Sequence, residues 1–312
     1  MITSLINKLG ALTKTYRNGG IRSVIEKVGK HVLVSSTVSS YIKRVLGDDL
    51  HQSIYMYLRL GYWPHIRNPR TFNEKIMHRK LYTSDERFSI VEDKWRVREY
   101  VAERVGEEIL PELYQVTNDP EKIRFDDLPD EYVIKPTHMS GPVLFIDEDK
   151  YPNRERIKRT CDKWLNTIFG EVKGEYWYSE IKPRIIIEEY LHDEEHGVPP
   201  DYKFFCFHGE VEYIEVDIDR QSDHKRRFYS SDWKPQKFEL NYPLGPETTE
   251  PNKFNEMKEI SEKLAEEFDF IRVDLYQPNG DEIIFGELTV AHGSGGERFL
   301  PQKYDFKFGS LW

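Results

Sequence analysis

Cysteine is almost absent from this chain: its 312 residues include only Cys161 and Cys206. Two cysteines cannot build a disulfide framework, and their separation does not have the spacing of a metal site. No apolar run approaches the roughly 20 residues that span a bilayer, and the N-terminus lacks the continuous apolar stretch of a signal peptide. Together these absences indicate a protein of the reducing cytoplasm.

Several familiar catalytic motifs are missing as well. The chain contains no G-x-x-x-x-G-K-[ST] phosphate loop, no G-x-S-x-G nucleophile elbow and no H-E-x-x-H zinc motif. The histidines do not cluster in sequence. His138 and His292 follow expected strands, which makes them candidates for a site but not metal ligands.

Acidic residues outnumber basic ones outside the N-terminus. The formal net charge is −10, yet the first 46 residues hold eight Lys or Arg and one acid, a charge of +7, so the rest of the chain carries −17. An acidic body argues against nucleic-acid binding, which depends on neutralising phosphates. Apolar residues at helical spacing in this basic segment allow peripheral contact with an anionic membrane. The alternative, which we favour, is a helix pair that packs on the body of the protein.

The remaining periodicity predicts an α+β protein. A helical region is expected over residues 1–90, in which Thr71 and Glu74 predict a capping box for a helix from Phe72 to Leu81. Other helices are expected at Val91–Val105, 154–170 and Phe254–Phe268. Strands are expected at Leu113–Val116, Tyr132–Lys135, Val143–Ile146, Arg184–Glu188, Tyr202–Phe207 and Val211–Val216. The polar, proline-rich stretch 220–250 is interpreted as a long insertion or lid.

The most informative stretch is a hairpin near the C-terminus. Apolar runs at 271–276 and 283–289 flank Asn279-Gly280, a strong signal for a two-residue turn. Such a turn places Arg272 opposite Glu287 and Asp274 opposite Phe285. Because side chains alternate with period two, one face then carries four polar residues: Arg272, Asp274, Glu287 and Thr289.

Two carboxylates and a guanidinium on one face of an apolar hairpin are costly to bury without partners. A divalent metal and a phosphate would be such partners, which makes this face a candidate site. The alternative is a surface ladder with a cross-strand pair between Arg272 and Glu287. A register slip of one residue would move Glu287 to the other face, so the prediction depends on the turn.

Four weaker signals precede the hairpin. Lys94 opens an expected helix, and Lys135 ends an apolar strand before the polar turn 137–141, so both ammonium groups suit a phosphate. The apolar strand 185–187 runs into Glu188 and Glu189, where backbone groups and a carboxylate could bind an adenine and a ribose. Lys203 lies on an alternating strand. Taken singly, each of these residues is better explained as a solvated charge.

The order of these residues resembles the ATP-grasp superfamily. Particular phrases resemble its TupA-like branch, which is associated with teichuronopeptide and other surface-polysaccharide biosynthesis. These phrases are Phe72-Asn73-Glu74-Lys75-Ile76, Asp93-Lys94-x-x-Val97-Arg98-Glu99-Tyr100-Val101, Leu128-Pro129, Phe204-x-Cys206-Phe207-x-Gly209 and Phe285-Gly286-Glu287-Leu288-Thr289. The resemblance covers roughly residues 70–309.

The resemblance implies an ATP-grasp fold, in which two α+β subdomains enclose ATP, and it implies Mg²⁺ as the metal. We expect a helical N-terminal region at 1–90, a first subdomain at 91–191 and a second at 192–312. The implied nucleotide-binding residues are Lys94, Lys135, Ser140, Gly141, Glu188, Glu189, Tyr190, Leu191, Asp193 and Lys203. The implied metal ligands are Asp274, Glu287 and Thr289, and the implied catalytic residues are Arg272, Lys203 and His292.

Two positions depart from the pattern of the superfamily. Thr289 stands where an asparagine is common, which puts a second Mg²⁺ in doubt, and the loop 137–141 is poor in glycine.

The function implied by the resemblance is an ATP-dependent carboxylate–amine ligase that attaches an amino acid to a uronic acid of a surface polysaccharide. One alternative is a kinase of a sugar hydroxyl, with His292 or Asp217 as base. The other is a non-catalytic nucleotide-binding scaffold.

Overall fold

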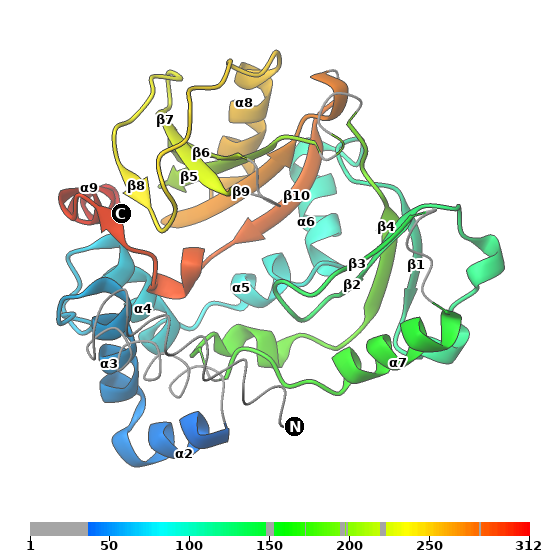
Figure 1. The fold of residues 1–312 in the computed structure, drawn as a ribbon, viewed down its shortest axis with the longest axis horizontal. Coiled ribbons are helices and arrows are strands. Elements are labelled where there is room, and N and C mark those ends of the chain that lie inside the picture. The colour runs from blue at the N-terminus through cyan, green and yellow to red at the C-terminus, as the bar shows by residue number, and fades with distance from the viewer. Residues whose placement is uncertain are drawn as a thin grey trace.

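Two antiparallel sheets lie side by side in the computed structural model (Figure 1). The structure describes residues 37–147, 153–171, 173–193, 197, 199–218, 223–280 and 282–312. Most of the basic segment 1–46, with its predicted membrane contact, therefore lies outside the described residues. None of the helices in the described part of the chain combines the length and apolar character needed to span a membrane.

Within the described residues, five helices precede the first sheet: α2 (Thr37–Leu46), α3 (Asp48–Leu60), α4 (Phe72–Tyr82), α5 (Glu86–Val91) and α6 (Arg96–Val105). The predicted capping box is confirmed, because the Glu74 amide donates to Thr71 Oγ1 at 3.2 Å and the Thr71 amide donates to Glu74 Oε2 at 3.0 Å. The single helix expected over 91–105 is wrong. Asp93 Oδ1 accepts the amide of Trp95 at 2.9 Å, so the chain turns between α5 and α6.

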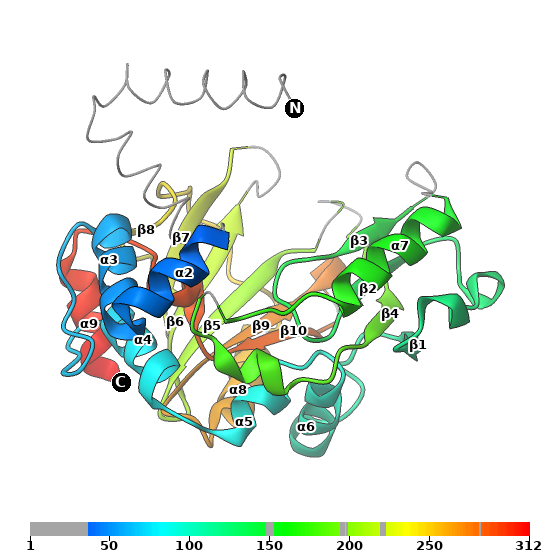
Figure 2. The ribbon, with the colours of Figure 1, turned by 90° about the horizontal axis from the view of Figure 1, so that it is seen from below.

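The first sheet has four strands in the order β1-β4-β2-β3. Their bounds are β1 (Leu113–Thr117), β2 (Tyr132–Pro136), β3 (Leu144–Ile146) and β4 (Ile185–Glu189). Helix α7 (Arg154–Leu165) ends earlier than the expected residue 170 and lies along the outer face of this sheet (Figure 2). Ile134, Ile187 and Ile157 form a dry core there. By alternation, Lys135 and Glu188 project from the opposite, inner face.

The second sheet has five strands in the order β10-β9-β5-β6-β7. Their bounds are β5 (Asp201–Phe207), β6 (Glu210–Ile218), β7 (Lys225–Ser230), β9 (Phe270–Tyr276) and β10 (Ile284–Thr289). The interpretation of 220–250 as an insertion or lid is wrong, since β7 is an edge strand of this sheet. In the same stretch, β8 (Glu239–Leu240) pairs with β11 (Phe299–Leu300). Phe228 and Tyr229 of β7 are buried, which the polar composition of the stretch concealed.

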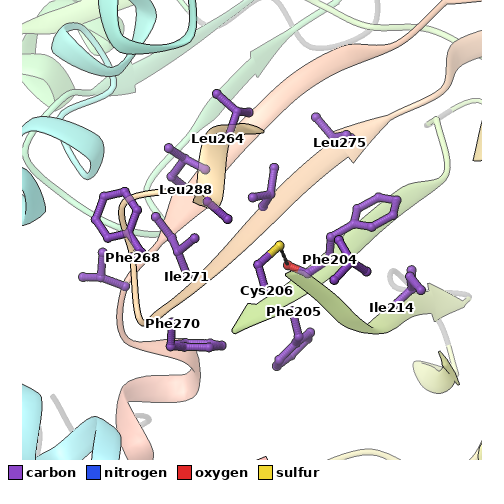
Figure 3. Close-up of a cluster of buried hydrophobic side chains, with 14 of the residues drawn as sticks. Phe204, Phe205, Cys206, Ile214, Leu264, Phe268, Phe270, Ile271, Leu275 and Leu288 are labelled. Atoms are coloured by element: carbon purple, nitrogen blue, oxygen red, sulfur yellow. Dashed lines mark hydrogen bonds between the residues drawn. The ribbon is translucent and has the colours of Figure 1, made fainter. Parts of the chain in front are cut away.

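The two faces of the five-stranded sheet differ in chemistry. One face is apolar and packs on α8 (Phe254–Ala265) through residues such as Phe204, Cys206 and Leu264 (Figure 3). Phe205 projects from the other face, where it meets Phe308 of α9 (Lys303–Leu311) at 5.8 Å between ring centroids. Phe72 of α4 joins the same aromatic group, 4.9 Å from the Phe270 ring. Helices α4 and α9 thus cover the aromatic half of this face.

The α+β fold and the helical region ahead of the sheets agree with the sequence prediction. The four-stranded sheet lies within residues 113–189 and the five-stranded sheet within 201–289, each with its own apolar core. The domain boundaries expected at residues 90 and 191 stay a prediction. Helix α4 packs on α9 rather than on the first sheet, so the helical region is joined to the C-terminal half of the protein.

Candidate functional site

Strands β9 and β10 form the expected hairpin with a different register. Asp274 pairs with Glu287 and Arg272 pairs with Thr289, so the predicted partners, Glu287 for Arg272 and Phe285 for Asp274, are wrong. The turn is longer than two residues, since β9 ends at Tyr276 and β10 begins at Ile284. At Glu287 the register differs from the prediction by two residues. Because side chains alternate with period two, the four polar residues still share one face.

A bulge at Gly286 produces this arrangement. The register shifts between Phe285 and Glu287, which returns Glu287 to the face of Asp274. A Cβ at position 286 would lie 2.9 Å from Tyr276 Cε2 and 3.0 Å from the Asp274 carbonyl oxygen. Only glycine allows the two strands to approach this closely, so Gly286 is the local reason that both carboxylates face the same way.

The Arg272 guanidinium lies between the two carboxylates. Its Nε donates to Asp274 Oδ1 at 2.6 Å, and its Nη2 donates to Asp274 Oδ2 at 2.7 Å and to Glu287 Oε1 at 2.8 Å. Asp274 is 2% exposed, whereas the Glu287 side chain is 45% exposed. Burial alone would raise the pKa of Asp274, but Arg272 and Lys203 hold that pKa below its usual value. Asp274 is therefore ionised, and the group around Arg272 is open to solvent on its Glu287 side.

A network of ion pairs extends across the same face, here called the charged face. Lys203 Nζ contacts Asp201 and lies 3.2 Å from Asp274 Oδ2. Six carboxylates meet three Lys or Arg in this network: Asp201, Glu215, Asp217, Asp274, Glu287 and Glu297 against Lys203, Arg226 and Arg272. Burial raises the pKa of Glu215, against the charge of Arg226. The excess of carboxylates over basic groups favours binding of a cation.

His292 lies behind Arg272. Arg272 Nη1 donates to His292 Nδ1 at 2.8 Å, and His292 Nε2 is 3.0 Å from Glu297 Oε2. The ring is 2% exposed, so in this structure His292 touches other protein groups rather than the open side of the site. Its predicted catalytic role stays a prediction, and the geometry favours a positioning role for this ring.

Lys135 lies on strand β2 of the other sheet, and Lys94 lies in the turn between α5 and α6. Lys135 Nζ lies 3.0 Å from Glu188 Oε2, and Lys94 Nζ donates to the Met139 carbonyl at 2.7 Å. Burial lowers the pKa of Lys94, whereas the charge of Glu287 raises it. The charges of Glu287 and Lys135 both act on Lys94, so the structure brings both predicted lysines near the open carboxylate of the hairpin, although the three residues belong to separate elements.

The predicted phosphate loop lies directly on this group. The backbone amide of Lys94 donates to the Thr137 carbonyl at 3.2 Å, which ties the start of the loop to the lysine. Ser140 and Gly141 at the tip are exposed. In the described part of the chain, no heavy atom beyond its two sequence neighbours lies within 4 Å of a Cβ built at Gly141, where φ is +102°. The tip therefore has room to move over a ligand held by the lysines.

The predicted adenine hinge connects the two sheets, and several of its side chains are already engaged. Glu188 pairs with Lys135 and with Arg98, whose Nη1 is 3.0 Å from Glu188 Oε1. Glu189 Oε2 accepts the Glu112 amide at 3.1 Å. Asp193 Oδ2 accepts the Asn279 amide at 2.9 Å and so links the hinge to the hairpin turn. Tyr190 stays near the surface, with its ring 5.6 Å from that of Phe145, and Leu191 is half-buried.

Sequence reasoning missed several charged residues of the site. Asp201, Glu215, Arg226 and Glu297 were not singled out as members, and Glu92 was overlooked. Glu92 Oε1 accepts the Val290 amide at 3.0 Å, next to the end of β10, and burial raises the pKa of Glu92 to about 7. The alternation of charge along β6 was the available signal for the acids of that strand.

The hairpin carboxylates suit Mg²⁺ only in combination with a ligand. Within the described residues, no group of three or more His, Cys, Asp or Glu side chains is placed to hold a metal by itself. Mg²⁺ is commonly bound by one or two carboxylates together with substrate phosphates and water. Asp274 and Glu287, joined by one guanidinium and beside two lysines, fit that arrangement. Thr289 Oγ1 lies 3.5 Å from Glu287 Oε1 and could contribute a hydroxyl.

Comparison with known proteins points to one family. The family model described as TupA-like ATPgrasp matches residues 74–312. No curated protein matches the chain.

Among solved structures, the D-alanine–D-alanine ligase of Bacillus anthracis complexed with ATP has 14% identity and a TM-score of 0.41 over 65% of this chain and 55% of that one. The L-amino acid ligase of Bacillus licheniformis has 13% identity and a TM-score of 0.40 over 71% and 46%. The ATP-grasp ligase PsnB complexed with a phosphomimetic variant of its minimal precursor, Mg and ADP has 12% identity and a TM-score of 0.42 over 96% and 73%. The chain thus spans about half the length of the first of these ligases. The family match carries the assignment, since the structural similarities are distant.

Proposed function

The chain belongs to the TupA-like ATP-grasp family, and we propose that it is an ADP-forming carboxylate–amine ligase that uses ATP and Mg²⁺. The expected enzyme class, nucleotide and metal all agree with this membership. The observation that carries the proposal is the position of Arg272 between Asp274 and Glu287. Lys94 lies close enough to Glu287 for the charge of that carboxylate to raise the pKa of the lysine. This arrangement suits the phosphate tail of a nucleotide.

The reaction proceeds in two steps. An oxygen of the substrate carboxylate attacks the γ-phosphorus of ATP, the bond to the β,γ-bridging oxygen breaks, and ADP leaves with that electron pair. The amine nitrogen then attacks the carbonyl carbon of the acylphosphate, phosphate departs and one proton is lost from nitrogen, which leaves an amide. Both steps need charge neutralisation and alignment more than a protein nucleophile.

The protein residues have separable roles in these steps. Lys94 and Lys135 bind the phosphates, and the exposed tip at Ser140 and Gly141 covers them with backbone amides. Arg272 stabilises the charge that spreads over the transferred phosphoryl group. When bound to Asp274 and Glu287, Mg²⁺ supplies charge neutralisation at the phosphate tail. Lys203 holds Asp274 in place through its 3.2 Å contact, so its role is to orient the metal ligand.

The substrates follow from the association of the TupA-like branch with teichuronopeptide synthesis. We propose a uronic acid of a surface polysaccharide or of its precursor as the carboxylate, and an amino acid as the amine. A cytoplasmic location, with peripheral membrane contact through residues 1–46, stays a prediction.

The geometry disfavours the kinase alternative. A kinase of a sugar hydroxyl needs a base that can reach that hydroxyl. His292 is 2% exposed and the Asp217 side chain is 1% exposed, and both are engaged in contacts to other charged groups. The scaffold alternative fits less well than catalysis, because the lysines, the arginine and both carboxylates of the site are present together.

Product analysis tests the proposal. The protein is incubated with ATP, Mg²⁺, uronic-acid sugars and pooled amino acids, and the products are analysed by mass spectrometry. We expect ADP, phosphate and an amide that appears only when both an acid and an amine are supplied. A phosphorylated sugar formed without an amine would establish the kinase instead, and the absence of ATP turnover with every acid and amine would refute the ligase.

A further inference from the structure

The edge strand β7 contributes an arginine to the interior of the charged face. Arg226 is 9% exposed and lies three strands away from β9 in the sheet order. Its Nε lies 3.0 Å from Glu215 Oε1 and 2.9 Å from Asp217 Oδ1, and its Nη1 lies 2.7 Å from Glu297 Oε2. One guanidinium therefore holds three carboxylates from β6 and from the segment after β10.

The first connection from Arg226 to the hairpin runs through Glu297 and His292. Glu297 Oε2 accepts a hydrogen bond from Arg226, and the same oxygen is 3.0 Å from His292 Nε2. Arg272 can only donate, so His292 Nδ1 must accept its hydrogen bond at 2.8 Å. The proton of a neutral His292 therefore sits on Nε2 and is donated to Glu297. Arg226 therefore holds the Glu297 carboxylate in place, and that carboxylate selects the His292 tautomer that is protonated on Nε2.

The second connection runs through β6 and β5. Asp217, held by Arg226, has its other oxygen 3.8 Å from Lys203 Nζ, and Lys203 lies 3.2 Å from Asp274 Oδ2. The two connections therefore end on the two halves of one ion pair, Arg272 and Asp274. Arg226 itself has no direct contact with either of them among the interactions of the described residues.

We propose that Arg226 is a positioning residue, which sets the orientation of Arg272 and the tautomer of His292 through Glu297 and supports Asp274 through Asp217 and Lys203. The catalytic meaning of this role rests on the proposed ligase function, whereas the connection itself is a property of the free protein. A lysine would keep the charge but could not span three carboxylates in the fixed fork of a guanidinium.

The neighbouring residue provides a matched control. Arg227 is also buried, at 8% exposure, and pairs with the largely exposed Glu247 at 3.2 Å. Because successive residues of a strand project to opposite faces, Arg227 points away from the charged face. Arg227→Lys therefore makes the same chemical change in the same strand without touching the two connections.

The test compares Arg226→Lys with Arg227→Lys by two measurements. We expect kcat for ADP formation to fall roughly 10- to 100-fold in Arg226→Lys, with KM for ATP changed less than about threefold, since misplacement of a transition-state group lowers kcat. We expect no change in either constant for Arg227→Lys. In ¹⁵N NMR of the free protein, His292 should be protonated on Nε2 alone in the wild type and in Arg227→Lys, and should lose this single tautomer in Arg226→Lys.

The two measurements keep this proposal separate from the ligase proposal. Absence of turnover in the wild type would refute the ligase, and the His292 spectrum would still decide the role of Arg226. An unchanged spectrum or an unchanged kcat in folded Arg226→Lys would overturn the positioning role. If thermal unfolding shows that Arg226→Lys does not fold, Glu297→Gln interrupts the first connection at its next member and is judged by the same two criteria.

Discussion

The two sheets meet the same candidate ligand in different ways. On the five-stranded sheet, Arg272 and Asp274 are buried, and each has several ionic partners. On the four-stranded sheet, the Lys135 side chain is 30% exposed and pairs with Glu188, and the tip of the neighbouring loop is open. We infer that the proposed metal side, on the five-stranded sheet, is fixed in advance, whereas the proposed phosphate-binding side, on the four-stranded sheet, adjusts when a nucleotide binds.

Loss of a carboxylate on the fixed side should have the largest effect. We expect Asp274→Asn to lower the rate of ADP formation roughly 100- to 1,000-fold, the range for loss of a group that stabilises charge in a transition state. It should also lower the free energy of unfolding by about 3 kcal/mol or more, because Arg272 and Lys203 lose a buried partner. Turnover assays and urea unfolding measure the two effects.

Asp232→Asn is the control for this change, since Asp232 is an exposed carboxylate that pairs with Lys234. It should leave both quantities unaltered. Full turnover in Asp274→Asn would contradict the metal-binding role of this residue.

Loss of a lysine on the adjustable side should act mainly on nucleotide binding. We expect Lys135→Met to raise KM for ATP about 10- to 100-fold, as for loss of a charge-assisted hydrogen bond. The free energy of unfolding should fall by less than about 1 kcal/mol, because the pair is partly exposed and Arg98 still neutralises Glu188. Lys158→Met on α7, away from the inner face, should change neither. A fall in kcat with an unchanged KM would show that Lys135 belongs to the fixed side.

Glu92, which lies next to the end of β10, should make the free energy of unfolding depend on pH. Burial raises its pKa from the ordinary value to about 7. The folded protein therefore binds a proton that the unfolded chain releases, and this contribution to stability is lost as pH rises from about 4.5 to about 7. At pH 8 the free energy of unfolding of Glu92→Gln should exceed that of the wild type by up to roughly 3 kcal/mol. At pH 5 this difference should be smaller. If Glu92→Gln and the wild type had equal free energies of unfolding at pH 5 and also at pH 8, the stability would not depend on the protonation of Glu92.

The smallest effect should come from the residue that departs from the superfamily pattern. Thr289 is half-buried beside Glu287, and an amide oxygen is a better Mg²⁺ ligand than a hydroxyl. We expect Thr289→Asn to lower the Mg²⁺ concentration for half-maximal turnover by about two- to fourfold, a fraction of the effect of a full ligand. Thr289→Val removes the oxygen at similar volume and should raise that concentration. The same Mg²⁺ dependence in both variants would exclude Thr289 from the metal site.

Local signals in the sequence predicted most elements and the polar face of the hairpin. The capping box at Thr71 and Glu74, the strand that carries Lys135 and the shared face of Asp274 and Glu287 all depend on neighbours a few residues away. The face was predicted correctly from a wrong register. The bulge at Gly286 depends on its close approach to Tyr276, which periodicity alone does not reveal.

The missed residues depend on partners far along the chain. Arg226 is buried because Glu297, 71 positions later, neutralises it, so its strand was taken for a polar insertion. Glu92 is half-buried, and Tyr178, 86 positions later, donates to its carboxylate at 2.5 Å. A buried charge looks like a surface charge in sequence until its partner is known, which is why the fixed side of the site was only half predicted.

The most direct test of the central claim is a crystal structure with Mn²⁺ and a non-hydrolysable ATP analogue, in which anomalous scattering locates the metal. We predict a Mn²⁺ ion bound by both Asp274 and Glu287 and by phosphate oxygens, with Lys94 and Lys135 on the same phosphates. A metal bound elsewhere, or a nucleotide whose phosphates lie away from the β9–β10 hairpin, would contradict it.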